Sequence, residues 1–109
     1  MSWQVRPGPE GTTVWGEVSG EEGAELGQAL LALPVEDEAR LLLADLDLED
    51  GVAVAHLVTA LRALRSRSGR LVLVQAPQML AHTLYKVGAL HDPGLVLVDP
   101  RQDEGLGAG

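Results

Sequence analysis

Four carboxylates stand close together at Asp45, Asp47, Glu49 and Asp50, and Gly51 follows them. In an extended segment alternate side chains point the same way, so the first three could bind a divalent cation. The glycine of a calcium-binding loop, however, would fall one residue earlier. Asp50 is also suited to cap a helix, because its carboxylate can accept hydrogen bonds from the first free backbone amides. The spacing favours a solvated, helix-capping acidic turn over a metal site, with a partner-binding surface as the remaining alternative.

The other side chains that carry chemistry are scattered along the chain. There is no cysteine, which excludes disulfides and thiol catalysis, and His56, His82 and His91 show no paired ligand spacing. Ser66 and Ser68 lie near the end of an expected helix without a nucleophile elbow. We therefore predict a protein that is not an enzyme and that has no metal and no cofactor.

Composition and charge limit the class of partner. The net charge is −8 and the pI is near 4.6, so phosphate backbones and anionic lipid surfaces should repel the protein. We find no signal peptide and no apolar run near the roughly 20 residues of a membrane span, and we expect a cytoplasmic protein. The 109 residues predict a single domain over residues 1–99, with residues 100–109 as a loose tail.

The acidic segment is expected between a buried strand and a helix. Leu41 to Ala44 is an apolar run, whereas residues 52 to 67 have the apolar spacing of a helix. In an open α/β sheet, function usually lies where a strand ends and turns into a helix. The acidic segment is therefore the candidate site.

The remaining elements alternate between strand and helix patterns. We expect strands at residues 3–5, 12–18, 40–44, 71–75 and 95–98, and helices at 19–33, 52–67 and 77–87. The order β-β-α-β-α-β-α-β predicts an α/β fold: a small mixed, mostly parallel five-stranded sheet with the helices mainly on one face. Two of these strands are apolar on both sides, so part of this chain or another chain should cover the second face. A homodimer through that face is one alternative.

Two pairs of residues make specific packing predictions. Ser19 precedes Glu22 by the spacing of a capping box, so the first helix should begin there. Gly23 and Gly27 weaken this helix and are expected to let it lie close to the sheet. Both predictions depend on the position of the first helix.

The two tryptophans are the largest side chains of the first two expected strands. Trp3 and Trp15 are most simply explained as a pair across those strands. The alternative is that they anchor an interface, where tryptophan is enriched. The strand register distinguishes the two interpretations.

Several segments, taken in order, resemble the STAS domain family. They are V-W-G-E-V at residues 14–18, D-L-D-L at 45–48, R-S-G-R-L-V-L-V at 67–74, and A-P-Q-M-L through K-V-G-A-L at 76–90. The resemblance covers Val14 to Asp99, which is most of the chain. It implies a small α/β sandwich that docks onto protein partners, such as a kinase-like anti-sigma factor or a transporter subunit.

The family's phosphorylated switch motif is Asp, then Ser or Thr, any residue, and Gly, at the start of the second helix. In the two registers that fit this chain, the hydroxyl position falls on Gly51 or on Glu49, and neither can accept a phosphate. The carboxylates would then act as a permanent negative charge. A hydroxyl elsewhere, such as Ser19 or Thr59, is the alternative acceptor.

We therefore expect a non-enzymatic regulatory module that resembles an anti-sigma factor antagonist and works by protein–protein interaction. Its expected contact residues lie on the acidic turn and the exposed side of the second helix: Asp47, Glu49, Asp50, Gly51, Val52, Ala53, His56, Thr59 and Arg62. The alternatives are a STAS-type subunit of a membrane transport complex and a small-ligand or nucleotide-binding domain. In the latter, Gln75, Asp99 and the acidic turn would converge at the carboxyl ends of the strands.

Overall fold

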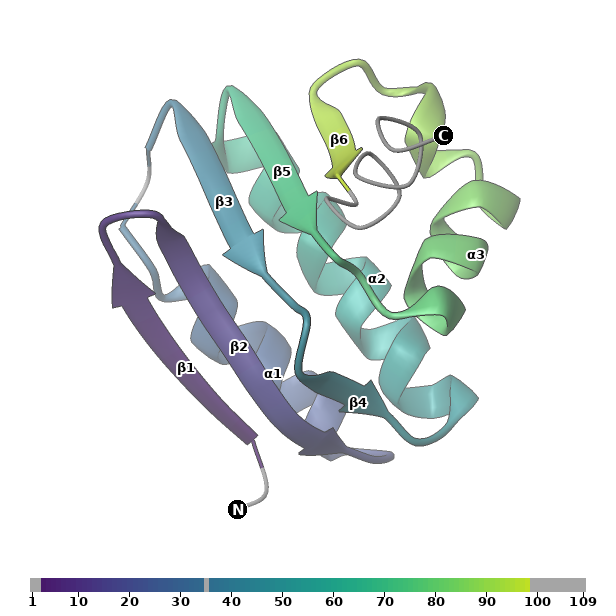
Figure 1. Cartoon of the computed structure of the whole chain (residues 1–109). Helices are drawn as coiled ribbons and strands as arrows, with labels where there is room; N and C mark the ends of the chain where they lie inside the picture. Colours follow the sequence, from purple (N-terminus) through teal and green to yellow (C-terminus); the bar gives the residue numbers. More distant parts are fainter. Residues whose placement is uncertain (1–2, 35, 99–109) are drawn as a thin grey trace, which may run out of the picture.

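Six strands form one mixed sheet in the computed structural model of the chain, which describes residues 3–34 and 36–98 (Figure 1). The strands are β1 (Trp3–Gly8), β2 (Gly11–Val18), β3 (Glu38–Leu42), β4 (Leu46–Leu48), β5 (Arg70–Val74) and β6 (Leu95–Val98). Their order is β1-β2-β3-β5-β6, and β4 pairs with β2. Among the described strands, only β1 and β2 pair antiparallel. The predicted α/β class and mixed, mostly parallel sheet are confirmed, whereas the prediction of five strands is wrong. Asp99 and the predicted tail at 100–109 lie outside the described residues.

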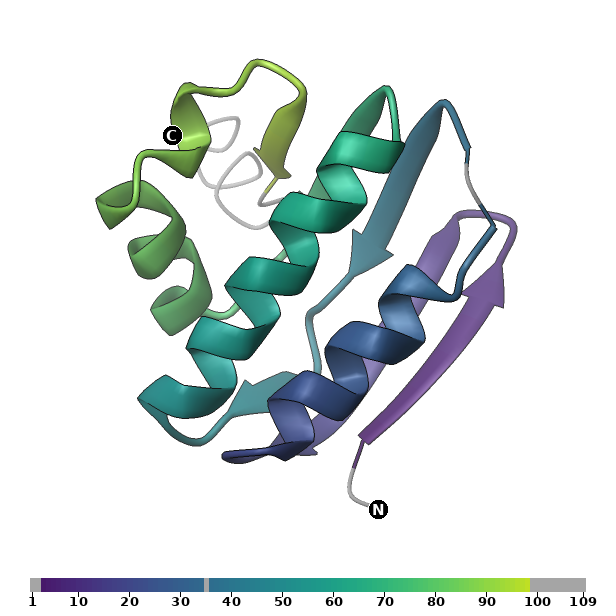
Figure 2. The same ribbon diagram turned by 180° about the vertical axis from the view of Figure 1, so that it is seen from behind.

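Three α-helices lie mainly on one face of this sheet. They are α1 (Glu22–Leu31), α2 (Gly51–Arg67) and α3 (Gln78–Lys86), and the short 3-10 helix η1 (Ala89–His91) follows. Figure 2 shows α1 and α2 side by side across the sheet, with α3 next to α2 on the side of β6. The other face has no helix over it in Figure 1, as predicted. In the part of the chain that the structure describes, no helix is long and apolar enough to cross a membrane.

The core lies between the sheet and the helices. Alternate strand residues point toward α1 and α2, and Val14, Leu41 and Leu73 among them are at most 1% exposed. Leu57 and Leu61 meet them from the buried side of α2 and are equally inaccessible. Each such leucine contributes about 1.5–3 kcal/mol by leaving water. This packing makes the sheet and α2 a rigid support for the segment that joins them.

The sixth strand lies inside the segment predicted to be an acidic turn. Leu46 and Leu48 of β4 are 6% and 4% exposed and pack into the core. Within β2, Thr12 and Thr13 at the start pair with β3, whereas residues 16–18 at the end pair with β4. β3 and β4 thus pair with the two ends of β2, and residues 43–45 connect them. The prediction of a turn, which rested on the density of carboxylates, is wrong here. The alternation of leucine with acid is the pattern of a half-buried strand.

The glycines of α1 bring this helix close to α2. The prediction that they face the sheet is wrong. A Cβ atom at Gly23 would lie 2.8 Å from the carbonyl oxygen and 2.9 Å from the Cα of Ala53. A Cβ atom at Gly27 would lie 2.8 Å from the Cβ of Ala60. The two helices therefore meet through small residues on both sides. Just before α1, the amide and the hydroxyl of Ser19 both donate to the carboxylate of Glu22, which is half of the predicted capping box.

The strand register separates the two tryptophans. Trp3 stands opposite Gly16, whereas Trp15 stands opposite Gln4. Because adjacent residues of a strand point to opposite faces, Trp3 lies on the helix side, where it packs against the core, and Trp15 lies on the helix-free face. The predicted cross-strand pair is wrong.

Candidate functional site

Three carboxylates gather on the helix-free face at the carboxyl ends of β2 and β4. Glu17 stands opposite Asp47 in the parallel pairing, and the backbone amide of Glu49 donates to the Val18 carbonyl at 2.9 Å, which continues the ladder. All three carboxylate side chains are exposed. We call Glu17, Asp47 and Glu49 the acidic ridge. In the sequence analysis we missed Glu17, because only the pairing of β2 with β4 brings it beside the others.

Crowding of like charges on this ridge changes the acidity of Glu49. A side-chain hydrogen bond with Glu17 raises the pKa of Glu49, and desolvation and repulsion from Glu17, Asp47 and Glu22 add to the effect. The ridge is thus a place where negative charge is held at a cost to the folded protein.

We expect Glu49→Gln to raise the free energy of unfolding at pH 7. Folded Glu49 holds its proton more tightly than the unfolded chain, so its stabilising contribution is complete below the ordinary pKa of 4.5 and is lost as the pH rises through the raised value. The variant should therefore lose less stability than the wild type between pH 4.5 and neutrality. Urea denaturation across this pH range measures the difference. Glu10→Gln, at the opposite end of β2, is the matched control, and equal pH profiles for Glu49→Gln and wild type would contradict the prediction.

Asp50 fixes the start of α2 to the loop before α1. Its Oδ1 accepts a hydrogen bond from the Ala53 amide at 2.9 Å, which is the predicted helix cap. Both of its carboxylate oxygens also accept from the amide of Gly20, at 3.1 and 3.0 Å. The side chain is half-buried, and its acceptors serve the fold. Asp50 therefore holds the segment between β4 and α2 in place and so positions the ridge.

The other predicted contact residues divide into exposed and covered groups. Gly51, Val52, Thr59 and Arg62 are exposed, and Val52 is 53% accessible despite being apolar. Ala53, in contrast, is completely buried beneath α1. His56 is half-buried, with its Cβ 3.1 Å from where a Cβ atom at Gly23 would be. We call the exposed line on α2 the docking stripe, and it consists of Val52, Ala55, Thr59 and Arg62.

Two hydroxyl groups near this surface differ in accessibility. The hydroxyl of Ser19 is half-buried and donates to Glu22 Oε1 at 3.0 Å. Thr59 is exposed on the docking stripe, where its hydroxyl donates to the Ala55 carbonyl at 3.1 Å. Of the two alternative phosphate acceptors, Thr59 is the more accessible one.

Within residues 3–34 and 36–98, no three histidine, aspartate or glutamate side chains are arranged to hold a metal ion. The acidic ridge is therefore not a preformed metal site. Its carboxylates can instead accept hydrogen bonds and ion pairs from cationic groups that approach from solvent. This chemistry suits the recognition of a cationic surface.

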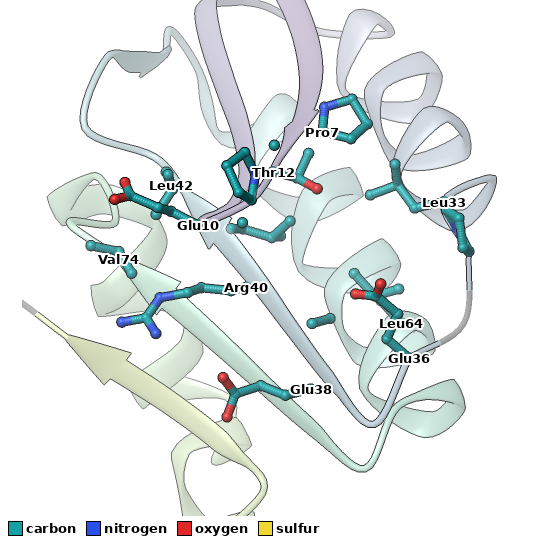
Figure 3. A pocket seen from close by; sticks show the side chains of 16 residues that line it. Pro7, Glu10, Thr12, Leu33, Glu36, Glu38, Arg40, Leu42, Leu64 and Val74 are labelled. Atoms are coloured by element: carbon teal, nitrogen blue, oxygen red, sulfur yellow. The ribbon is translucent and has the colours of Figure 1, made fainter.

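A hollow lies at the other end of the sheet. It encloses about 680 Å³ between the β1–β2 hairpin, the segment before β3 and the starts of the parallel strands (Figure 3). Arg40 and Thr12 supply polar groups, and Leu42 and Leu64 belong to its apolar lining. The sequence predicts a ligand site at the opposite, carboxyl ends of the strands. There Gln75 is half-buried in a left-handed conformation with φ 54°, and its backbone amide donates a hydrogen bond to the Val98 carbonyl. No local pattern in the sequence indicates this cleft, because its walls come from segments far apart in the chain.

No model of a known protein family matches this chain, and a search of curated proteins found no match. The fold and the site nevertheless define a class. It is a small α/β domain that presents an anionic ridge on its helix-free face, directly before the turn that leads into a capped helix.

Proposed function

We propose that the chain is a non-enzymatic regulatory interaction module whose protein partner docks on the acidic ridge and the docking stripe. The observation that carries the proposal is the crowding of three exposed carboxylates at the carboxyl ends of β2 and β4, next to the turn that Asp50 ties to the loop before α1 and that leads to the exposed Val52. A preorganised surface of this kind limits the ordering that binding requires.

The charge of the ridge defines the chemistry of the partner. The raised pKa of Glu49 reflects a hydrogen bond with Glu17, desolvation and repulsion from neighbouring carboxylates, and an arginine or lysine from another protein would relieve the repulsion. Val52 offers an apolar contact next to these charges, which is the composition of a small interface core with a polar rim. We therefore expect a partner surface that carries basic residues around an apolar patch.

The resemblance to the STAS family supports the same surface. In that family the start of the second helix carries a phosphorylated hydroxyl, whereas the equivalent positions here are Gly51 or Glu49. In this proposal the ridge supplies a constant negative charge to a kinase-like anti-sigma factor. A transporter subunit is the alternative partner that the same resemblance suggests.

A comparison of two bait proteins tests the proposal. The first bait carries Asp47→Arg and Glu49→Arg, and the matched control carries the charge reversal Glu10→Arg on the hairpin. We expect wild type and control to recover the same protein from the native host and the ridge variant to lose it, with at least a tenfold weaker Kd for the purified partner. Equal binding by the ridge variant would reject this surface as the docking site.

A small-ligand domain is the second candidate, favoured by the cleft of about 680 Å³. Its volume lies in the range of small-molecule sites, and Arg40 places one cationic group beside the apolar lining. Thermal-shift screening with nucleotides and small carboxylates tests this function. A shift of several degrees that Arg40→Ala abolishes would support it, and the ridge variant should leave such a shift unchanged.

A further inference from the structure

The helix-free face of the sheet has an apolar centre. Its residues alternate along the strands with those that point toward the helices, and they are Thr13, Trp15, Leu42, Val72, Val74, Val96 and Val98. Val72 is buried and the others are half-buried. Figure 1 shows this face without a helix over β2, β3 and β5. A mostly parallel sheet normally has both faces covered, so this face calls for an occupant.

The two ends of the same face carry opposite charges. Arg6, which stands opposite Thr13, and Arg40 are exposed toward the amino ends of the parallel strands, and neither forms an ion pair with another described residue. The acidic ridge lies at the carboxyl ends, where Glu17 is four residues beyond Thr13 on β2. Four strand residues span about 13 Å, which exceeds the Debye length of about 8 Å at physiological salt. The two ends therefore do not neutralise each other within one copy.

We propose that this face binds a second copy of the chain, sheet against sheet, with the strands of the two copies antiparallel. A twofold axis between the sheets that crosses the strands at Trp15 superimposes position 17 of one copy on position 13 of the other. Glu17 of each copy then lies over the level of Thr13, where the other copy carries Arg6. A partner of a single charge would satisfy only one end of the face, whereas a second copy satisfies both.

Trp15 lies at the centre of this arrangement. A residue on a twofold axis meets its own counterpart, and tryptophan is among the residues that contribute most to interfaces. Leu42 and Val74 extend the apolar contact to one side of it, in the same row across the sheet as Thr13. Trp3, on the other face, takes no part. The second interpretation of the tryptophans, as interface anchors, thus applies to Trp15 in this proposal.

The test measures the mass of the purified full chain by sedimentation between about 1 and 500 µM. We expect a concentration-dependent dimer, and we expect Trp15→Ala to raise its Kd about tenfold or more. Arg6→Glu and Glu17→Arg should each be monomeric where the wild type is dimeric, because each places like charges together twice. An equimolar mixture of these two variants should restore the dimer, since both contacts then pair opposite charges.

Controls separate this effect from general damage. Lys86→Glu reverses a charge on α3, away from the face, and should dimerise as the wild type does. Circular dichroism checks that each variant is folded. Arg40→Glu with Glu49→Arg serves as a second charge pair if one of the first fails, because the same axis places Arg40 of one copy over the level of Glu49 of the other. A monomeric wild type across the concentration range, or a mixture that stays monomeric, overturns the proposal and leaves the face to a different occupant. Glu17 belongs to both surfaces, so a second copy and the partner proposed for the ridge would compete for it. The sedimentation test uses the chain alone, so its failure is distinguishable from a failure of the bait experiment.

Discussion

Gly23→Ala should lower the free energy of unfolding by about 2 kcal/mol, although alanine favours a helix by about 1 kcal/mol over glycine. The added methyl would lie 2.8 Å from the Ala53 carbonyl oxygen and 2.9 Å from its Cα. These are backbone atoms of α2, so they cannot rotate away as a flexible side chain can. The helices would have to separate, which disturbs the start of α2 just after the ridge residue Glu49. Urea denaturation followed by circular dichroism measures the loss.

Gly27 provides a version of this experiment that can be reversed. Gly27→Ala should also destabilise, because the new methyl would meet the Cβ of Ala60 at 2.8 Å. Ala60→Gly removes that atom, so the double variant should recover part of the loss, and the double-mutant cycle isolates the contact. Gly51→Ala is the control, since nothing lies within 4 Å of its added methyl. If Gly23→Ala and Gly27→Ala were as stable as the wild type, that result would contradict the close contact between α1 and α2.

Asp50→Ala should cost about 2–3 kcal/mol. The substitution removes the cap of α2 and leaves the half-buried amide of Gly20 without its acceptor. It should also weaken partner binding, because the ridge would lose the bond that fixes it to the loop before α1. Chemical denaturation and the binding assay of the bait experiment measure the two effects separately.

Two substitutions control for the loss of charge at Asp50. Asp50→Asn keeps an oxygen for the Ala53 amide, and asparagine caps helices as well as aspartate does, so its loss should stay below about 1 kcal/mol. Asp47→Ala removes a neighbouring exposed carboxylate and should change the free energy of unfolding by less than about 0.5 kcal/mol. A loss for Asp50→Asn as large as that for Asp50→Ala would show that charge, and not capping, dominates.

Local patterns in the chain predicted the parts of the site that depend on neighbours in sequence. The cap at Asp50 followed from an acid placed just before an apolar helical pattern, and the structure has that hydrogen bond. Exposure of Val52, Thr59 and Arg62 agrees with the spacing of α2, which buries Val54, Leu57 and Leu61 on its other side. The burial of Ala53 could not be predicted in this way, because it depends on how closely α1 approaches α2.

Long-range pairing decided what these patterns left open. Glu17 joins Asp47 and Glu49 only because β4 pairs with the end of β2, and no feature near Glu17 in the sequence indicates this. The hairpin register placed Trp3 and Trp15 on opposite faces, since a shift of one residue in a strand exchanges its faces. The cleft at the amino ends likewise depends on segments that meet only in the folded chain.

The sequence by itself determined the α/β class, the three helices, the cap at Asp50 and the strongly acidic character of the chain. Helix periodicity, capping and charge are properties of short stretches, so they can be recognised before the chain folds. Only the tertiary structure decided that β4 exists, that α1 lies against α2, and which carboxylates form the ridge. Those features depend on contacts between distant residues, whose register is set by the packing of the whole core.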